Sequence, residues 1–576
     1  MKLSTLFIAA AGLLTAAAAS ESYDSSDSSK PRRIAIIGAG AAGASTAYHL
    51  RQFADQDGVA VNITLFEKTD RIGGRTLTAH AYDDPNQPVE LGASIFVEVN
   101  AILWNAASEF SLPLIPAGGN DDDGGLLGIW DGDRFVYTQD DRSYGWWNLV
   151  KLFWNYGSAP YRANKLMQAT IRRFLSLYEA PYFPFRSLTT RAYELELTYV
   201  TSQTGAQFLE ANKVSDAFSH DIVQASTRVN YASNLARIHG LDAMVALAPA
   251  GASQIRGGNW QIFDRMARAS GADIHLNTSV ASIDCVDGTE PPNSKYVLKT
   301  TNAAGVAEED EYDNIVVATP YQFSKISTGD GVLQTAIDEI PYVQLHVTLF
   351  ASPLRPSPAF FGLEPGTPVP TTVLTTLADD DDDQGSSGAD GSGKAGFFSV
   401  STLRRAINPD TLREEYLYKI FSPEKVTPEF LSKLFGVEVP ESFTSTEPKA
   451  REENESETTS ESEADASSSV PVISWYFPHV FHSYPKAYPR VTFQDPVVGD
   501  GLYYTSGIES FISTMETSAL MGKNVARLIV DDIQGLTTGE AVPEGWEAAK
   551  ESTTTKDGKK IAGLRPDHGQ QVVGEL

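Results

Sequence analysis

Continuous apolar runs separated by a helical pattern predict a βαβ unit close to the start of the chain. Residues 33–37 and 59–66 are almost wholly apolar, and residues 41–53 between them repeat apolar positions at helical spacing. Strands that are apolar at every position are typical of a parallel sheet buried on both faces. We therefore expect a doubly wound α/β arrangement here.

Four further stretches have a readable pattern. Residues 144–178 are helical and rich in aromatic side chains, and residues 258–320 repeat an α/β pattern. Residues 342–400 are rich in strands, and residues 511–530 predict a helix. The mixture predicts an α/β protein with a parallel sheet and a second, mixed sheet accompanied by helices.

Charge is distributed unevenly over the 576 residues, which hold 74 acidic and 45 basic side chains for a net charge of -29. Such a field repels nucleic acid, so we expect no nucleic-acid partner. Much of the acidity lies in low-complexity stretches, which we interpret as solvated loops and not as metal sites. We expect acidic surface insertions at 378–394 and 441–469 and a polar tail at 541–576.

The first residues have the features of a signal peptide. Lys2 is followed by the apolar run 6–14 and by three alanines at 17–19. We therefore expect a cleaved signal at 1–19 and a mature protein in the secretory pathway, with the vacuole, the lysosome or the outside as its destination. No later apolar run reaches the roughly 18 residues of a membrane span, so no transmembrane segment is expected.

The chain has a single cysteine and three sequons for N-glycosylation. Cys285 lies in an apolar stretch and is expected to pack and not to react. Sequons begin at Asn62, Asn277 and Asn454, and the acidic loop makes Asn454 the best candidate for a glycan.

A glycine-rich turn between the first strand and helix predicts a dinucleotide site. Gly38 permits the tight turn, Gly40 allows backbone to approach a pyrophosphate, and Gly43 allows the helix to pack on the strand. The helix N-terminus offers N–H groups to phosphate. Glu67 ends the next strand, at about the 20-residue spacing of a ribose-binding carboxylate. This context predicts a Rossmann-type domain.

Two following motifs favour FAD over NAD. Residues 70–76, with Gly73, Gly74 and Arg75, resemble the second flavin motif of the amine oxidase and phytoene desaturase superfamily. Residues 89–94 resemble the strand and turn beside the flavin ring in that superfamily. Arg75 could add a cation at the pyrophosphate.

Distant segments fit the same superfamily. Residues 313–320 resemble the superfamily's strand that ends in a small-residue turn near the cofactor. Residues 272–283 resemble the strand whose backbone, around Val280, meets the adenine. Residues 505–509 and 514–518, before a helix, are similar to the superfamily's closing flavin motif, where helix N–H groups face a phosphate and the flavin ring. Cys285 is remote and no attachment sequence is present, so the FAD is expected to be non-covalent.

Over nearly all of residues 33–530 the chain is similar to the prenylcysteine oxidases, also called prenylcysteine lyases. The stretches that carry the resemblance are 146–157, 247–253, 256–260, 373–376, 416–423 and 502–504. The resemblance implies oxidation of an S-prenyl-L-cysteine thioether by molecular oxygen. The products would be a prenyl aldehyde, L-cysteine and hydrogen peroxide. Such a reaction needs positioning and the cofactor's own electronics.

The motifs and the resemblance together give a set of expected cofactor-binding residues. They are Gly38, Gly40, Ala41, Gly43, Glu67, Lys68, Gly73, Gly74, Arg75, Gly92, Ala93, Ser94, Val280, Ala318, Thr319, Gly507, Ile508, Met515 and Glu516.

We expect two domains that interleave along the chain. The FAD-binding domain would take residues 31–110, 230–325 and 495–535, and the substrate domain residues 111–229 and 326–494.

Two other functions remain as alternatives. A flavin amine oxidase would share every flavin motif, but it usually has an aromatic pair facing the flavin, which is not clearly placed here near residues 504–508. A non-catalytic prenyl carrier of the Rab-escort type would lack a signal peptide, and an intact Gly73–Arg75 motif argues against it.

The sequence does not single out a catalytic residue, but it offers candidates on the substrate side. The aromatic helix at 146–156 could line a prenyl slot, contact a membrane surface or simply pack in the core. His479 and His482 are candidates for proton transfer, although structural or surface roles are favoured. Arg142 or Arg228 could hold the substrate carboxylate, and the residues do not choose between them.

Overall fold

The computed structural model describes residues 30–117, 125–140, 145–248, 251–289, 291, 294–378, 381, 391–441 and 471–536, with the side chains of 145–149 left out. The expected signal peptide, Asn454, the polar tail, and most of both acidic insertions lie outside the described residues.

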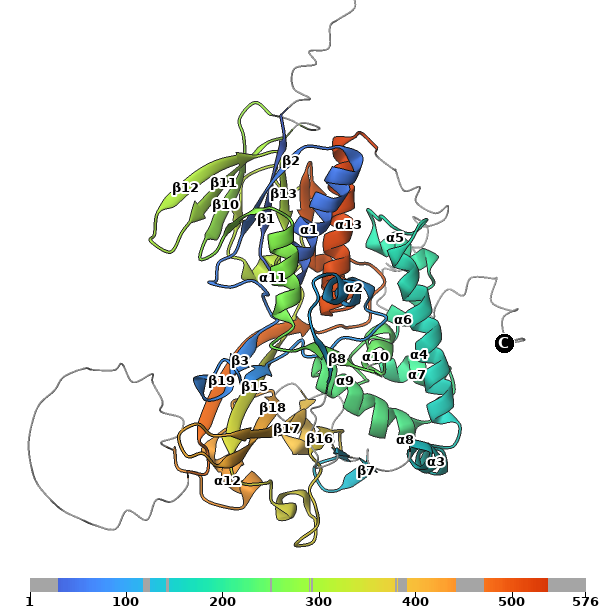
Figure 1. Cartoon of the computed structure of the whole chain (residues 1–576). Helices are drawn as coiled ribbons and strands as arrows, with labels where there is room; N and C mark the ends of the chain where they lie inside the picture. The colour runs from blue at the N-terminus through green and yellow to red at the C-terminus, as the bar shows by residue number, and fades with distance from the viewer. Residues whose placement is uncertain are drawn as a thin grey trace, which may run out of the picture.

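Six strands form a mostly parallel sheet at one end of the molecule (Figure 1). The five strands from β21 to β9 run parallel, and only β20 is antiparallel to its neighbour. The order is β20 (Val497–Gly499), β21 (Leu502–Tyr504), β13 (Asn314–Val317), β1 (Arg32–Ile37), β2 (Val61–Phe66) and β9 (Asp273–His275). The predicted βαβ unit is confirmed, because α1 (Ala41–Asp57) joins β1 to β2.

Strand β1 is apolar from Ile34 to Ile37 because each of its faces packs against a different core. Ile34 and Ile36 belong to the core shared with the helices, whereas Ala35 and Ile37 belong to the core beneath a second sheet. The helices on the first face are α1, α11 (Trp260–Ala269) and α13 (Met515–Ile533). The second sheet is β12 (Ala307–Tyr312), β11 (Tyr296–Thr301), β10 (Ser279–Cys285) and β14 (Ser327–Thr328).

A mixed seven-stranded sheet lies at the other end of the molecule (Figure 1). Its strands are antiparallel except for the parallel pair β16 and β6. The order is β19 (Trp475–Pro485), β15 (Tyr342–Ser352), β18 (Glu414–Ser422), β17 (Ser399–Ile407), β16 (Thr372–Thr375), β6 (Leu126–Trp130) and β7 (Phe135–Asp140).

Helices form a layer along the right-hand side of Figure 1, beside both large sheets. They are α3 (Gly145–Tyr156), α4 (Ala159–Leu175), α5 (Leu188–Glu194), α6 (Thr198–Thr201), α7 (Gly205–Ala211), α8 (Asp216–Phe218), α9 (Gln224–Tyr231) and α10 (Gly240–Ala246). The remaining elements are α2 (Ala101–Glu109), α12 (Pro428–Phe435) and the strand pairs β3 (Thr78–His80) with β4 (Pro88–Glu90) and β5 (Leu114–Pro116) with β8 (Ser253–Ile255).

The six-stranded sheet collects strands from distant parts of the chain. β13 lies between β1 and β21, and the chain forms most of the seven-stranded sheet before it returns to β20 and β21. The predicted fold class, a Rossmann-type domain interleaved with a mixed-sheet and helical domain, is confirmed. The detailed assignment of segments to the two domains stays a prediction. Among the described residues, no helix is both long and apolar enough to cross a membrane.

Helix α13 packs closely on α1 at Gly522, which makes this glycine a test of the packing. A Cβ at Gly522 would lie 2.3 Å from the backbone oxygen of Ala42. Gly→Ala usually stabilises a helix interior by about 1 kcal/mol. We expect Gly522→Ala instead to lower the unfolding free energy by about 1–3 kcal/mol, because backbone must shift. Chemical denaturation measures this, with exposed Asn164→Ala in α4 as the control, and stabilisation by Gly522→Ala would contradict the packing.

Candidate functional site

A cavity of about 1040 Å³ lies where the turns of the six-stranded sheet face the seven-stranded sheet. Its volume is at or above the upper end of the roughly 300–1000 Å³ typical of small-molecule sites. Fifteen of the nineteen expected cofactor residues line it: Gly38, Gly40, Ala41, Glu67, Lys68, Gly73, Gly74, Arg75, Gly92, Ala93, Ser94, Ala318, Thr319, Met515 and Glu516. The structure thus brings together segments that are far apart in the sequence.

The glycine turns of this cavity approach one another so closely that side chains would not fit. Gly38 has a φ of +103°, and a Cβ there would lie 2.8 Å from the carbonyl oxygen of Ala318. A Cβ at Gly74 would lie 3.1 Å from the Cα of Gly40. Helix α1 begins here, and its N-cap Gly40 provides no side-chain cap. Backbone N–H groups and the positive end of the helix dipole are therefore available to an anionic ligand such as a pyrophosphate.

The carboxylate of Glu67 ties the glycine turn to the end of β2. Its Oε2 accepts a hydrogen bond from the Ala39 N–H at 2.9 Å, and its Oε1 accepts two from Thr69, at 2.9 Å from the N–H and 2.8 Å from the hydroxyl. A carboxylate oxygen has two acceptor positions, so Oε2 keeps one for a ribose hydroxyl.

Four of the expected residues do not line the cavity but support it. Gly43 lies under the turn, where a Cβ would approach the Gly38 oxygen to 1.8 Å. Gly507 packs against Gln494, and Ile508 is fully buried. Val280 lies in β10 of the second sheet, and its side chain is buried in the core between this sheet and the six-stranded sheet.

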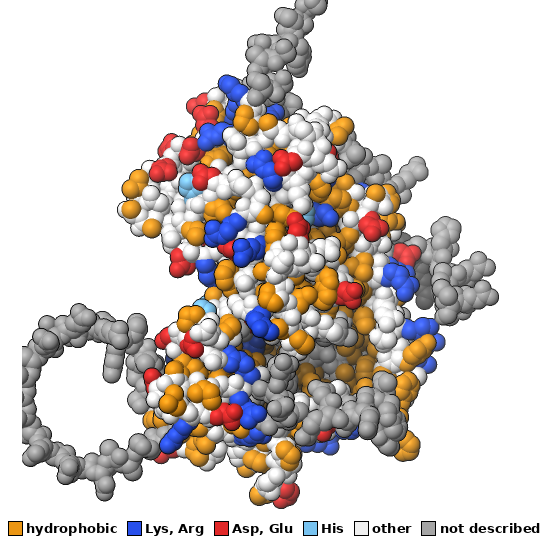
Figure 2. Space-filling view, viewed as in Figure 1, with side chains coloured by type: hydrophobic (Ala, Val, Ile, Leu, Met, Phe, Trp, Pro, Cys, Tyr) orange, Lys and Arg blue, Asp and Glu red, His pale blue; other side chains and the backbone are white. Residues whose placement is uncertain are grey.

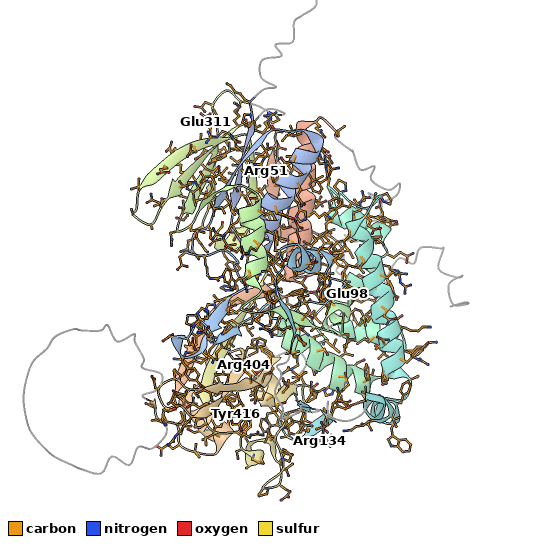
Figure 3. All side chains as sticks on the ribbon, in the orientation of Figure 1. Arg51, Glu98, Arg134, Glu311, Arg404 and Tyr416 are labelled. Carbon is orange, nitrogen blue, oxygen red and sulfur yellow. The ribbon has the colours of Figure 1, made fainter. Side chains whose placement is uncertain are left out.

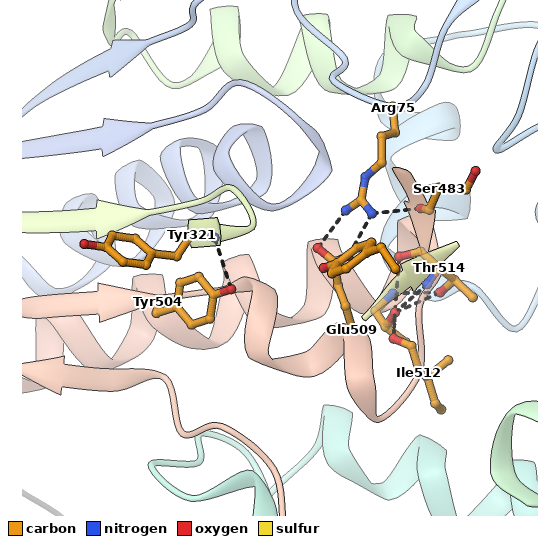
Figure 4. Close-up of polar contacts among 9 residues, drawn as sticks. Arg75, Tyr321, Ser483, Tyr504, Glu509, Ile512 and Thr514 are labelled. Carbon is orange, nitrogen blue, oxygen red and sulfur yellow. Dashed lines mark hydrogen bonds and ion pairs between the residues drawn. The ribbon is translucent and has the colours of Figure 1, made fainter. Parts of the chain in front are cut away.

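Arg75 forms an ion pair with Glu509 within the cavity wall (Figure 4). Its guanidinium donates to both carboxylate oxygens, at 2.6 and 2.8 Å, and to the Ser483 carbonyl at 2.8 Å. The Tyr342 hydroxyl donates to the same carboxylate at 3.0 Å. The charge of Arg75 is therefore balanced by Glu509 inside the protein, and its contribution at the pyrophosphate stays a prediction.

Glu516 has a structural partner that the sequence did not indicate. Its carboxylate accepts hydrogen bonds from the N–H groups of Ile102 and Leu103 at the start of α2 and from the Tyr178 hydroxyl. Burial raises the pKa of Glu516 to about 7, although these hydrogen bonds lower it. The side chain of Glu516 thus serves α2, and at this position the backbone is left to face a ligand.

Lys419 on β18 joins the seven-stranded sheet to the turn after β4. Its ammonium donates to the Ser94 hydroxyl at 3.1 Å and to the Glu90 carbonyl at 3.2 Å. Burial lowers the pKa of Lys419 to about 8, while the same factor raises that of the Glu90 carboxyl to about 7. Two of the three N–H groups of the lysine are used, which leaves one for a ligand in the cavity.

A second basic side chain on this sheet is Arg404 of β17 (Figure 3). It lines the cavity, and its guanidinium donates to Gln87 Oε1 at 2.6 Å.

Apolar side chains form the wall of the cavity on the helical side. Ile171, Phe174 and Leu175 come from α4, and Val245 and Ala246 come from α10. The rings of Tyr231 and Tyr484 also line the cavity, edge to face, with centroids 5.6 Å apart. This part of the cavity can take a long apolar group.

The remaining candidates from the sequence lie as follows. His479 and His482 both line the cavity, and the His482 ring stacks on Phe323 at 4.3 Å. Burial lowers the pKa of His479. Arg142 is outside the described residues, and among those described there is no cluster of three or more metal-binding side chains.

Arg228 is not a substrate-binding residue. Its side chain is fully buried and donates to Asn234, Thr375 and the carbonyls of Gly391 and Ser392. Burial lowers its pKa to about 9. The guanidinium fixes the end of the acidic insertion against β16, so it is not available for a carboxylate in the cavity.

The family described as "Prenylcysteine lyase" matches residues 139–539, and the "NAD(P)-binding Rossmann-like domain" matches residues 36–110. The chain belongs to the prenylcysteine lyase family.

Curated relatives of this prenylcysteine lyase family member extend over most of the chain. It is 27% identical to a farnesylcysteine lyase of Arabidopsis thaliana over 519 residues, covering 87% of this chain and 88% of that protein. It is 26% identical to prenylcysteine oxidase 1 of Rattus norvegicus over 520 residues, covering 86% and 88%. The predicted family and the prediction of an oxidoreductase are confirmed.

A solved structure supports the fold. Cyclohexylamine oxidase from Brevibacterium oxydans matches with a TM-score of 0.50 at 15% identity, covering 88% of this chain and 100% of that one. At this identity the likeness shows the fold alone.

Several residues of the prenylcysteine lyase site were not predicted from the sequence. Glu509 lies within a quoted motif, but its partner Arg75 is 434 positions away. Tyr342 and Ser483 lie in no motif, and Lys419 lies in the stretch 416–423, where the resemblance assigned it no role. The general rule that a buried charge is paired predicts an acidic partner for Arg75, but it does not say that the partner is Glu509.

The Arg75–Glu509 pair predicts a measurable coupling. Glu509 is 3% exposed and Arg75 33%, so water screens the pair only in part. We expect Glu509→Gln to lower the unfolding free energy by about 2 kcal/mol, because the guanidinium loses its charged partner. Adding Arg75→Met should then cost less than it does alone, as a double-mutant cycle measures. Exposed Glu308→Gln is the control, and strictly additive effects would contradict the pairing.

Proposed function

We propose that this protein binds FAD non-covalently and oxidises the thioether of S-prenyl-L-cysteine. The observation that carries the proposal is one cavity that joins a glycine cradle for a dinucleotide to an apolar chamber with a lysine at its wall. The names of the relatives, farnesylcysteine lyase and prenylcysteine oxidase 1, support the same substrate class.

The residues around the cradle fit FAD. The turns at Gly38–Gly40 and Gly73–Gly74 would receive the pyrophosphate, and Glu67 the ribose. Gly92–Ser94 and the start of α13 would lie beside the flavin ring. Cys285 lies in β10 and does not line the cavity, which supports non-covalent binding.

When bound, FAD would accept a hydride from the carbon between sulfur and alkene and pass the electrons to molecular oxygen. Overall, thioether, water and oxygen give the thiol of cysteine, a prenyl aldehyde and hydrogen peroxide. The carbon–sulfur bond breaks after water adds to the oxidised carbon. The protein's part is to position the thioether and to restrict the access of other water.

The cavity suggests how the substrate lies. The prenyl chain would follow the apolar wall formed by α4 and α10, where burial of each CH₂ contributes about 0.8 kcal/mol. The carboxylate would meet the ammonium of Lys419, which is close to Ser94 beside the expected flavin ring. The reacting carbon would then lie between these two anchors.

A second candidate is a flavin amine oxidase, because Tyr231 and Tyr484 form an aromatic pair within the cavity. The aromatic pair of such enzymes is expected near residues 504–508, whereas these two rings come from α9 and β19. A panel of amines therefore belongs in the same assay.

The secretory pathway remains our proposal for the location, with the vacuole, the lysosome or the outside as destination. The basic residue, apolar run and alanines at the N-terminus support it.

Substrate addition without oxygen tests the proposed reaction. We expect farnesylcysteine to bleach the flavin absorbance of the protein anaerobically, and oxygen to restore it while peroxide forms. A flavin that bleaches with amines and not with farnesylcysteine would support the amine oxidase instead. A protein that cannot be loaded with flavin would support the carrier.

The role of Lys419 gives a separate prediction, in which farnesylcysteine is compared with its methyl ester. The ester lacks the carboxylate, so we expect wild type to have a KM about tenfold lower for the acid, the value of one charged hydrogen bond. Lys419→Met should remove this preference, and Lys419→Arg should keep part of it. Because the ammonium is lost as pH rises through about 8, the preference should also decline above that pH. An unchanged preference in Lys419→Met would contradict the role.

A further inference from the structure

Helix α3 exposes an apolar stripe to solvent. Val150, Phe153 and Trp154 follow one another at helical spacing and are 45%, 49% and 88% exposed. The other side of the helix is anchored, because Leu152 packs into the core and the Tyr156 hydroxyl donates to Asp221 at 2.9 Å. A surface helix normally turns its polar face outward, whereas this helix exposes an apolar face to solvent.

The neighbouring helix α4 adds positive charge to the same edge of the molecule (Figure 1). Residues 145–175 contain five basic residues and no Asp or Glu, in a chain with a net charge of -29. Tyr161, Lys165 and Arg172 share one exposed stripe of α4, and the Lys165 ammonium lies 5.4 Å from the centre of the Tyr161 ring. Figure 2 shows basic and apolar side chains along this edge.

We propose that α3 and the exposed stripe of α4 form a docking surface for an anionic lipid bilayer. Trp and Tyr favour the interface between lipid and water, and each basic residue near an anionic surface adds attraction. The net charge of -29 does not decide this attraction, because charges more than about 8 Å apart are largely screened at physiological salt. The basic residues of α4 favour an anionic bilayer over an uncharged one, because an uncharged surface would not attract them.

The docking surface adjoins the cavity through α4. Another side of this helix lines the cavity with Ile171, Phe174 and Leu175. A prenylated substrate dissolved in the bilayer would therefore be delivered beside the apolar wall. This corollary rests on the proposed function, whereas the docking surface rests on exposure and charge alone.

Flotation of the full chain with vesicles tests the surface. We expect it to float with phosphatidylcholine vesicles that contain phosphatidylserine, less with phosphatidylcholine alone, and less at high salt. The double variant Phe153→Ser/Trp154→Ser should bind about tenfold more weakly. The variant Lys165→Glu/Arg172→Glu should lose the preference for phosphatidylserine.

A matched control removes an apolar side chain elsewhere. Leu412, in the turn between β17 and β18, is 77% exposed, so Leu412→Ser should bind vesicles as wild type does. Circular dichroism shows that each variant is folded. Vesicle binding that is absent in wild type, or equal in Phe153→Ser/Trp154→Ser and wild type, would overturn the proposal. Because flotation needs no turnover, a protein that oxidises soluble farnesylcysteine but ignores vesicles would refute the surface alone.

Discussion

The close approach of three backbone turns is the constraint on which the site depends. A Cβ at Gly38 would lie 2.8 Å from the Ala318 carbonyl oxygen, which excludes it, and a Cβ at Gly74 would lie only 3.1 Å from the Cα of Gly40. These contacts hold the strand–helix junction, the second glycine motif and the turn after β13 together. The space that side chains would fill is left to a ligand, with the N-terminus of α1 facing it.

The two sheets are joined at this site by polar contacts as well as by packing. Arg75 comes from the glycine motif, Glu509 from the segment before α13, and Tyr342 and Ser483 from strands of the seven-stranded sheet. Lys419 makes the corresponding link at the turn after β4. These contacts fix the position of a ligand in the glycine cradle relative to a molecule bound against the seven-stranded sheet. A reaction between cofactor and substrate requires such fixed positions.

Local patterns in the sequence predict the parts of the fold that local interactions determine. The βαβ unit follows from the apolar runs, because β1 packs against a core on each face. The glycine turns follow from their motif. The partners of Glu516 and Arg228 could not be predicted, since the first is the start of α2 and the second the end of an insertion, and no local signal encodes these pairings. Arg228 shows that a basic residue near the substrate region can serve packing instead of binding.

The central claim is that the glycine cradle holds FAD without a covalent bond. The most direct measurement is to denature the purified protein with acid and to identify the flavin in the supernatant and the precipitate. We predict that FAD, about one per chain, is released completely into the supernatant, since only hydrogen bonds and packing hold it. Flavin that stays with the precipitated chain, or a protein that neither carries nor takes up FAD, would contradict the account.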